Sequence, residues 1–422
     1  MRRSLAAMDH ASADRIRRYQ ERRLRLLVRL VASRSPFYRR WFAESGVDPA
    51  SIRTLEDLPR LPLLDRRAVM DAPADFAVQP LRLMWPSSSS GTSGRPVTVY
   101  RTAGSSAFEQ AALQRQWGWF GLPRDARRVV LRGSSIAVDR GVLTHEIPGD
   151  HQLLVSSFHL TPDALPEILR TIRAFRPHAV EGWTSSLTLL AARMRDAGER
   201  LPVQAVITSS ETISTLQRQL MGSVFEAPIV DHYGQTERVA MAGTCEADGY
   251  HVFPDYGIVE LLPADDGRAE IVGTPLHNWG FPLLRYRTGD LVDPASAGQC
   301  PCGRSFPRLG AIAGRSEDAF VAADGRLIPL PSTVIDDLAG IDEAQIAQLA
   351  PGRFEVRVVP GRGFDADVNR AQVLRNIERL IGPGQDVAIR VMDGIPRSAS
   401  GKLRTAVVLP GGLPDGAGTL IT

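Results

Sequence analysis

Cysteine and lysine are scarce in this sequence. Its 422 residues include three cysteines and, among 50 basic side chains, a single lysine, Lys402. So few cysteines exclude a fold built on disulfides and fit a reducing compartment, so we expect a cytoplasmic protein. Long apolar runs are also missing, and none approaches the about 20 residues of a membrane span. The first residues are basic without an apolar stretch, which predicts no secretory signal.

The sequence also lacks a large excess of either positive or negative charge. The net charge is only +3, which is too weak to indicate a nucleic-acid partner. Arginine serves as well as lysine for surface charge, but it does not replace a compact ammonium group at a reacting centre. Lys402 is therefore a candidate catalytic residue, with an ordinary surface lysine as the alternative.

What is present is enough apolar sequence for a large core, at 43% of residues. Residues 12–45 have the periodicity of an amphipathic helix with arginines on one face, which fits either packing on the main domain or binding to a membrane or nucleic acid. Between about 97 and 290, buried strand patterns alternate with helical ones, which predicts layered α/β structure.

A break near Gly314 precedes a strand–helix–strand pattern. The predicted fold class is α/β, with a large N-terminal layered domain of parallel and antiparallel sheets and a small, mobile α+β C-terminal domain. We expect an N-terminal helical segment at 1–84 packed on the core, the rest of the core at 85–316, and the small domain at 317–422.

Three motifs carry candidate chemistry. The Ser/Thr/Gly run at 87–96 offers backbone and hydroxyl donors that can wrap phosphates, although an exposed linker has the same composition. DHYGQTE at 231–237 follows an apolar strand, where α/β sheets bind ligands. RYRTGD at 285–290 ends in an aspartate that can accept hydrogen bonds from a ribose.

The order of the motifs is more specific than any one of them. YGQTE (233–237), YRTGD (286–290), GRSED (314–318) and PRSASGKLRT (396–405) follow the Ser/Gly loop, and Lys402 is in the last. In this the chain resembles the adenylate-forming superfamily of acyl-CoA synthetases, adenylation domains and luciferases. Its SPFYRRWF segment (35–42) and its cysteine spacing are most similar to the phenylacetate–CoA ligase and CapK-like branch.

The resemblance implies roles for individual residues. Lys402, Glu237 and Thr236 would be catalytic, Lys402 bridging the substrate carboxylate and the phosphate or ribose oxygens, and Glu237 holding Mg²⁺. Glu317 would be the hinge, although many relatives have aspartate there. The acid would contact Arg132, Trp183 and His232. The residues implied to bind ATP are Ser88, Ser90, Gly91, Thr92, Ser93, Gly94, Ser210, Glu211, Thr212, Tyr233, Gly234, Asp290 and Arg315.

All three cysteines fall in one stretch with a histidine. Cys245, His251, Cys300 and Cys302 correspond to a cluster that holds zinc in similar branch members. Three thiolates and one imidazole form a closed tetrahedral set, typical of structural zinc. The alternatives are a degenerate remnant of such a site, or reduced cysteines that are simply buried.

The implied function is ATP-dependent activation of a carboxylic acid, aryl or small and polar, as an acyl-adenylate, followed by transfer to coenzyme A. The implied cofactors are ATP, Mg²⁺ and structural Zn²⁺. Two alternatives stay open: transfer to a carrier protein, an amine or nitrite in a biosynthetic pathway, and an inactive, regulatory nucleotide-binding relative. A homodimer is also left open. We expect no nucleic-acid partner.

Overall fold

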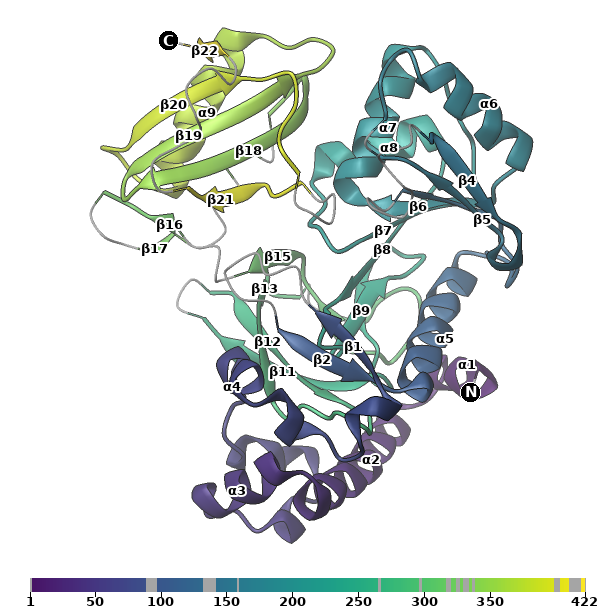
Figure 1. The fold of residues 1–422 in the computed structure, drawn as a ribbon, viewed down its shortest axis with the longest axis vertical. Helices are drawn as coiled ribbons and strands as arrows, with labels where there is room; N and C mark the ends of the chain where they lie inside the picture. Colours follow the sequence, from purple (N-terminus) through teal and green to yellow (C-terminus); the bar gives the residue numbers. More distant parts are fainter. Residues whose placement is uncertain are drawn as a thin grey trace. The chain divides into compact units, whose positions relative to one another are not determined.

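The fold was analysed in a computed structural model. It describes residues 2–88, 97–131, 142–157, 159–264, 267–295, 298–315, 320–323, 327–328, 334–335, 338–397, 403–409 and 419–421. The chain divides into two compact units (Figure 1). The first comprises Met1–Gly121 and Asp231–Ala313, and the second Leu122–Val230 and Gly314–Thr422. The division at residues 84 and 316 stays a prediction.

Helices form the N-terminal part of the first unit. The predicted single helix over 12–45 is wrong at one point, because Ser35 is extended and Pro36 starts a new helix. The Ser35 side chain then caps that helix by accepting from the Tyr38 backbone N–H. The helices are α1 (Arg2–Asp9), α2 (Ala13–Arg34), α3 (Pro36–Ser45), α4 (Arg66–Asp71) and α5 (Ala103–Trp119), with 3-10 turns at Pro49–Ser51, Leu55–Arg60, Pro73–Phe76 and Leu81–Leu83.

The apolar face of α2 lies in the core of the first unit. Leu24, Leu27, Val28 and Val31 are all buried, in one cluster with apolar side chains from the strands of the same unit. The Gln20 side chain also donates to the Pro254 carbonyl oxygen at 2.9 Å. The burial of this face explains the helical periodicity of the sequence without a membrane or nucleic-acid ligand.

The strands of the first unit are mainly antiparallel. One sheet has the order β11 (Gly257–Pro263), β12 (Ala269–Pro275), β13 (Tyr286–Val292), β15 (Ile312–Arg315). Strands β1 (Trp85–Ser88) and β2 (Thr98–Arg101) form an antiparallel pair. Strand β9 (Met241–Thr244) lies between β8 (Ile229–Gly234) and β10 (Tyr250–Val252), and β10 pairs with β14 (Arg308–Leu309).

Parallel strands and helices alternate in the first half of the second unit. Strands β3 (Arg128–Leu131), β5 (Gln152–Val155), β6 (Ala179–Trp183) and β7 (Ala205–Ser209) are parallel, and β4 (Thr144–Ile147) is antiparallel to β5. Every residue of β6 and β7 is buried, as expected for strands covered on both faces. The other elements are the 3-10 turn Pro148–Asp150 and the helices α6 (Leu165–Phe175), α7 (Thr184–Asp196) and α8 (Thr215–Phe225).

The C-terminal part of the second unit is a small α+β structure. Its sheet has the order β21 (Ala406–Val408), β18 (Ile341–Ala350), β19 (Arg353–Pro360), β20 (Asp386–Val391), β22 (Thr419–Ile421). Helix α9 (Ala366–Leu380) lies against the sheet (Figure 1), and its Val373 and Ile377 belong to the same buried cluster as residues of β18, β19 and β20. A short pair, β16 (Phe320–Val321) and β17 (Leu327–Ile328), precedes it. The predicted α/β class with parallel and antiparallel sheets is confirmed. Across the described ranges, we find no helix with the length and apolarity to cross a bilayer.

Candidate active site and metal centre

The 231–237 segment is held firmly where β8 ends. The Gln116 side-chain amide, from α5, donates to the carbonyl oxygens of Asp231 at 2.8 Å and Thr244 at 3.1 Å. A Cβ at position 243 would collide with this amide, which explains the glycine of β9. A buried amide therefore braces β8 against β9 and fixes the start of the motif.

The 285–290 segment is fixed by its own hydrogen bonds. Gly289 has a φ of +71°, a conformation that favours glycine. The Asp290 backbone N–H donates to the Thr288 hydroxyl at 3.0 Å, and that hydroxyl donates to the Ile271 carbonyl at 2.7 Å. The spacing Thr-Gly-Asp thus sets the position of the Asp290 carboxylate on β13.

The two segments meet through two tyrosine–carboxylate hydrogen bonds. The Tyr233 hydroxyl donates to Asp290 Oδ2 at 2.7 Å, and the Tyr286 hydroxyl donates to Glu237 Oε1 at 2.9 Å. All four side chains are buried, at 9% exposure or less. The structure therefore brings together Tyr233, Glu237 and Asp290, which the sequence singled out for nucleotide and Mg²⁺. Tyr286 belongs to the 286–290 motif, but nothing in the sequence assigned it a role of its own.

Arginine from β2 supports the same segment. The Arg101 guanidinium donates to the Thr236 carbonyl oxygen at 2.9 Å. Burial and the neighbouring Arg238 lower the pKa of Arg101, while Glu109 and Glu237 oppose the shift. Sequence reasoning missed Arg101 too, because it stands outside any motif. Nearby, the Ser88 hydroxyl at the end of β1 lies 3.0 Å from the Thr98 hydroxyl.

The predicted adenine-side residues lie in the second unit, after β7. Ser210 has a φ of +67°. The Glu211 carboxylate accepts from the Ser185 backbone N–H at 2.7 Å and from its hydroxyl at 3.1 Å. It therefore caps the N-terminus of α7, where a negative charge is favourable. Trp183, a predicted substrate contact, is buried at the end of β6.

Thr212 lines a cavity of about 260 Å³ in the second unit. Its wall also includes Ser185, Gln217 and residues of β18. The Arg397 guanidinium, from the lysine-containing motif, donates to the Ser185 hydroxyl at 3.2 Å and pairs with Glu343. The cavity combines hydroxyl, amide and charged groups at one place.

Of the other predicted site residues, three lie on described strands and the rest lie outside the described ranges. Arg315 contributes backbone to β15, and His232 is half-buried on β8, followed on that strand by Gly234. The residues that lie outside the described ranges are Ser90, Gly91, Thr92, Ser93, Gly94, Arg132, Glu317 and Lys402. Their assignments stay predictions.

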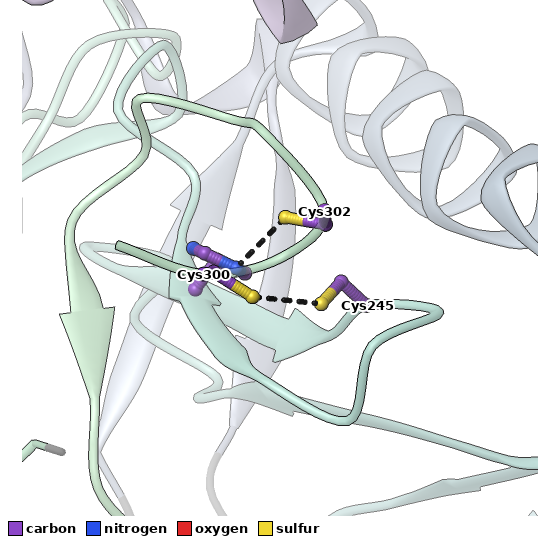
Figure 2. A group of neighbouring side chains, drawn as sticks. Cys245, Cys300 and Cys302 are labelled. Atoms are coloured by element: carbon purple, nitrogen blue, oxygen red, sulfur yellow. Dashed lines mark hydrogen bonds between the residues drawn. The ribbon is translucent and has the colours of Figure 1, made fainter. Parts of the chain in front are cut away.

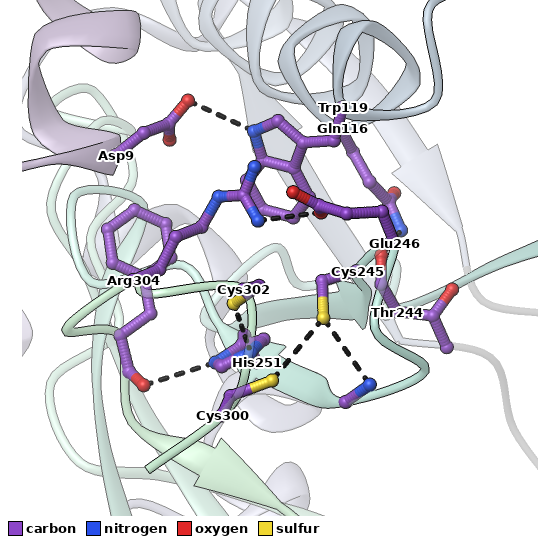
Figure 3. Close-up of polar contacts among 12 residues, drawn as sticks. Asp9, Gln116, Trp119, Thr244, Cys245, Glu246, His251, Cys300, Cys302 and Arg304 are labelled. Carbon is purple, nitrogen blue, oxygen red and sulfur yellow. Dashed lines mark hydrogen bonds and ion pairs between the residues drawn. The ribbon is translucent and has the colours of Figure 1, made fainter.

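The three cysteines (Figure 2) and His251 (Figure 3) meet in the first unit. Their ligand atoms all lie within 4.8 Å of one another. Cys245 follows β9, His251 is on β10, and Cys300 and Cys302 come from the loop before β14. A Cβ at Gly249 would press on Cys300 Sγ, so the turn between β9 and β10 needs a glycine. The cysteines are free rather than disulfide-bonded.

The donor set fits a tetrahedral zinc ion. Cys245 Sγ and Cys300 Sγ are 3.6 Å apart, close to the about 3.7 Å between two sulfurs at Zn–S bonds of about 2.3 Å. His251 Nε2 lies 3.4 Å from Cys302 Sγ, and its Nδ1 lies 3.1 Å from the Phe306 carbonyl. A carbonyl partner for Nδ1–H leaves Nε2 unprotonated and available to a metal.

Burial shifts the pKa values of several groups in the cluster. Burial raises the pKa of the Cys245 thiol to about 12 and lowers the pKa of the His251 imidazole. Burial also acts to raise the pKa of Cys302, but hydrogen bonds from Arg304 and its neighbours lower it. A bound cation would stabilise the thiolates that burial alone disfavours.

Arg304 links the cluster to α1 (Figure 3). It pairs with Glu246 at 2.7 Å and lies over the Trp119 ring at 4.0 Å. The Trp119 indole N–H donates to Asp9 Oδ2 at 3.0 Å. The contacts from Glu246 through Arg304 and Trp119 to Asp9 therefore connect the region of the cluster with helix α1.

The fold is that of an adenylate-forming ligase. It matches 2-hydroxyisobutyryl-CoA ligase, solved in the postadenylation state with R3-HIB-AMP, with a TM-score of 0.74 and 19% identity. The match covers 96% of this chain and 91% of that chain. No protein-family model matches the chain.

Curated proteins with similar sequences include coenzyme A ligases and CapK. The chain is 27% identical over 438 residues to phenylacetate–coenzyme A ligase of Thermus thermophilus, covering 94% of this chain and 97% of that protein. It is 20% identical over 397 residues to protein CapK of Staphylococcus aureus, covering 92% and 88% respectively. The predicted resemblance to the adenylate-forming superfamily, in its phenylacetate–CoA ligase and CapK-like branch, is confirmed. The prediction of an AMP-forming ligase of the acid–CoA type is confirmed at the level of enzyme class.

Proposed function

We propose that the protein activates a carboxylic acid with ATP and transfers the acyl group to coenzyme A. A carboxylate oxygen of the acid attacks the α-phosphorus of ATP, and pyrophosphate leaves. The thiol of coenzyme A then attacks the acyl carbon, and AMP leaves with the bridging oxygen. The observation that carries this proposal is the pair of buried carboxylates, Glu237 and Asp290, each held by a tyrosine of the opposite motif.

The residues divide the work between recognition and charge stabilisation. Asp290 accepts hydrogen bonds from the ribose hydroxyls, while the Tyr233 ring stacks on the purine. Glu237 holds Mg²⁺, which when bound neutralises charge on the phosphates. Thr236 and the Ser88–Gly94 loop contact the phosphate oxygens. Segment 210–212 lies on the adenine side, and Arg315 binds the ribose.

Lys402 stabilises negative charge in the transition state of adenylation. A positioned ammonium group that acts there contributes about 3–4 kcal/mol, or 10²–10³ in rate. Rotation of 317–422 about Glu317 then exchanges Lys402 for a surface that admits the thiol. Arg397, the second residue of the 396–405 motif, donates to the Ser185 hydroxyl, which in turn donates to Glu211. Arg397 and the adenine-side segment therefore belong to one hydrogen-bonded network.

We also propose an aryl or small polar acid as the substrate, with Arg132, Trp183 and His232 as its contacts. The support is the chemistry of these side chains, which combine a cation, an indole and an imidazole. An apolar pocket for a long fatty acid would need apolar residues at these positions instead.

A further proposal concerns the cysteine–histidine cluster. We infer that Cys245, His251, Cys300 and Cys302 hold a structural zinc ion, which when bound ties the β9–β10 turn to the loop before β14. The support is the closed set of four ligand atoms, without a position left for a reacting water.

The test is pyrophosphate release with a panel of aryl, small polar and long-chain acids, followed by mass spectrometry of the products. We expect release with aryl or small polar acids, and an acyl-CoA thioester when coenzyme A is added. Release driven by long-chain acids alone contradicts the substrate class. An adenylate that coenzyme A leaves unchanged, but that an amine, nitrite or a carrier protein consumes, contradicts the acceptor.

A further inference from the structure

Glu237 is buried, and its two carboxylate oxygens differ in their hydrogen bonding. Oε1 accepts the Tyr286 hydroxyl at 2.9 Å, whereas Oε2 has no hydrogen-bond partner within the described part of the chain. The side chain is only 4% exposed. An ionised carboxylate oxygen buried without a partner is costly, which favours a cation at that oxygen.

Arg101 of β2 does not supply a hydrogen bond to Glu237 Oε2. The charge of Glu237 acts on Arg101, but Arg101 donates to the Thr236 carbonyl oxygen. On the other side, Tyr286 is 1% exposed and packed in the core of the first unit. Its ring is therefore fixed, and a fixed phenol fixes the oxygen to which it donates.

We propose that Tyr286 is a positioning residue for the Mg²⁺ that accompanies ATP. It acts through Glu237, because its hydroxyl occupies Oε1, sets the rotation of the carboxylate and leaves Oε2 as the cation ligand. This inference rests on the proposed function and assigns Tyr286 to the metal side of the site. Tyr233 belongs to the ribose side, because its hydroxyl is on Asp290.

The test compares ATP affinity with and without the metal. Calorimetry gives the Kd of ATP in excess Mg²⁺ and in EDTA for the wild type and for Tyr286→Phe. We expect Tyr286→Phe to weaken ATP binding about tenfold in Mg²⁺ and less than about twofold in EDTA. A residue that only packs the core would change both affinities alike. Melting curves establish that the variant is folded.

The matched control is Tyr256→Phe. Tyr256 is also buried, at 2% exposure, and its hydroxyl donates to the Glu109 carboxylate at 3.1 Å. The control therefore loses a comparable hydrogen bond elsewhere in the same unit. We expect it to keep the wild-type dependence of ATP affinity on Mg²⁺.

A double-mutant cycle tests the route through Glu237. Glu237→Gln keeps an oxygen for Tyr286 but loses the charge, so we expect it to lose the gain in affinity that Mg²⁺ gives. Adding Tyr286→Phe to that variant should then change nothing more. If Tyr286→Phe does not fold, Glu237→Gln alone carries the test, because a wild-type gain in affinity from Mg²⁺ in that variant overturns the inference. An equal loss in Mg²⁺ and EDTA, no loss, or a further loss in the double variant overturns the inference. A wild type that binds no ATP overturns the proposed function with it.

Discussion

The Tyr233 hydroxyl lies 2.7 Å from Asp290 Oδ2, so the residue proposed to stack on the purine also holds the carboxylate proposed to bind the ribose. The two residues come from different motifs, on β8 and β13. One hydrogen bond therefore fixes the distance between the two recognition elements.

Asp290→Asn tests ribose recognition. We expect the wild type to bind ATP at least about tenfold more tightly than 2′,3′-dideoxy-ATP, because the hydroxyls donate to a charged acceptor. In Asp290→Asn the preference should fall to about twofold. Calorimetry with both nucleotides measures it, with Asp293→Asn as the control, since Asp293 is also close to β13 but pairs with Arg268. A preference that survives in Asp290→Asn contradicts the assignment.

Lys402→Arg tests the catalytic lysine. We expect adenylate formation, measured by ATP–pyrophosphate exchange, to fall by about 10²–10³, because a guanidinium does not reproduce the position of a compact ammonium group. The melting temperature should not change. Arg353→Lys, on the exposed start of β19, is the control for an arginine–lysine exchange. Near-normal exchange in Lys402→Arg defeats the assignment.

Metal content tests the cysteine–histidine cluster. We expect about one zinc ion per chain by mass spectrometry of the purified protein, and its loss in Cys300→Ser together with a lower melting temperature. Loss of the ion should also loosen α1, because Arg304 joins the cluster to Trp119 and Asp9. Limited proteolysis at α1 measures this. His145→Gln, an exposed site on β4, is the control. Metal-free protein with a rigid α1 would disprove the zinc site.

His277 predicts a pH dependence of stability. Burial lowers its pKa to about 3, and its Nδ1 lies 3.0 Å from the Tyr256 carbonyl. The unfolded chain binds a proton below about pH 6.5 that the folded chain excludes, so stability is lost as the pH falls from about 6.5 towards 3. At about pH 5, protonation of His277 in the unfolded chain has lowered the free energy of unfolding by about 2 kcal/mol.

His277→Gln should remove that part of the dependence, because an amide keeps a donor but does not titrate. Urea unfolding at about pH 7.5 and about pH 5 gives the difference for the wild type and the variant. His145→Gln again serves as the control. If the wild type and His277→Gln lose the same stability over this range, burial of a neutral imidazole is not the cause.

Much of the fold follows from the sequence because buried strands carry an uninterrupted apolar pattern. The range from about 97 to 290, predicted to alternate strands and helices, contains β6 and β7, in which every residue is buried. The helix predicted over 12–45 fails at Ser35, because serine and proline there start a new helix while the apolar period continues across the break. Local capping chemistry was stronger than periodicity at this point.

The candidate site was predicted only in part. Glu237 and Asp290 could be identified from the sequence alone, because each ends a short glycine-containing motif. Their partners, Tyr286 and Tyr233, depend on which strands approach each other, and that requires the fold. Glu211 shows the same limit: the sequence gives a carboxylate near the adenine side, but only the structure shows that it caps α7 through Ser185.

Oxygen transfer tests the central claim of acid activation through an acyl-adenylate most directly. An acid that drives pyrophosphate release is labelled with ¹⁸O in its carboxylate and turned over with ATP and coenzyme A. The mechanism predicts one ¹⁸O atom in the AMP that leaves, because a carboxylate oxygen bridges to the α-phosphorus. Label in inorganic phosphate with ADP as the product, or unlabelled AMP, would contradict it.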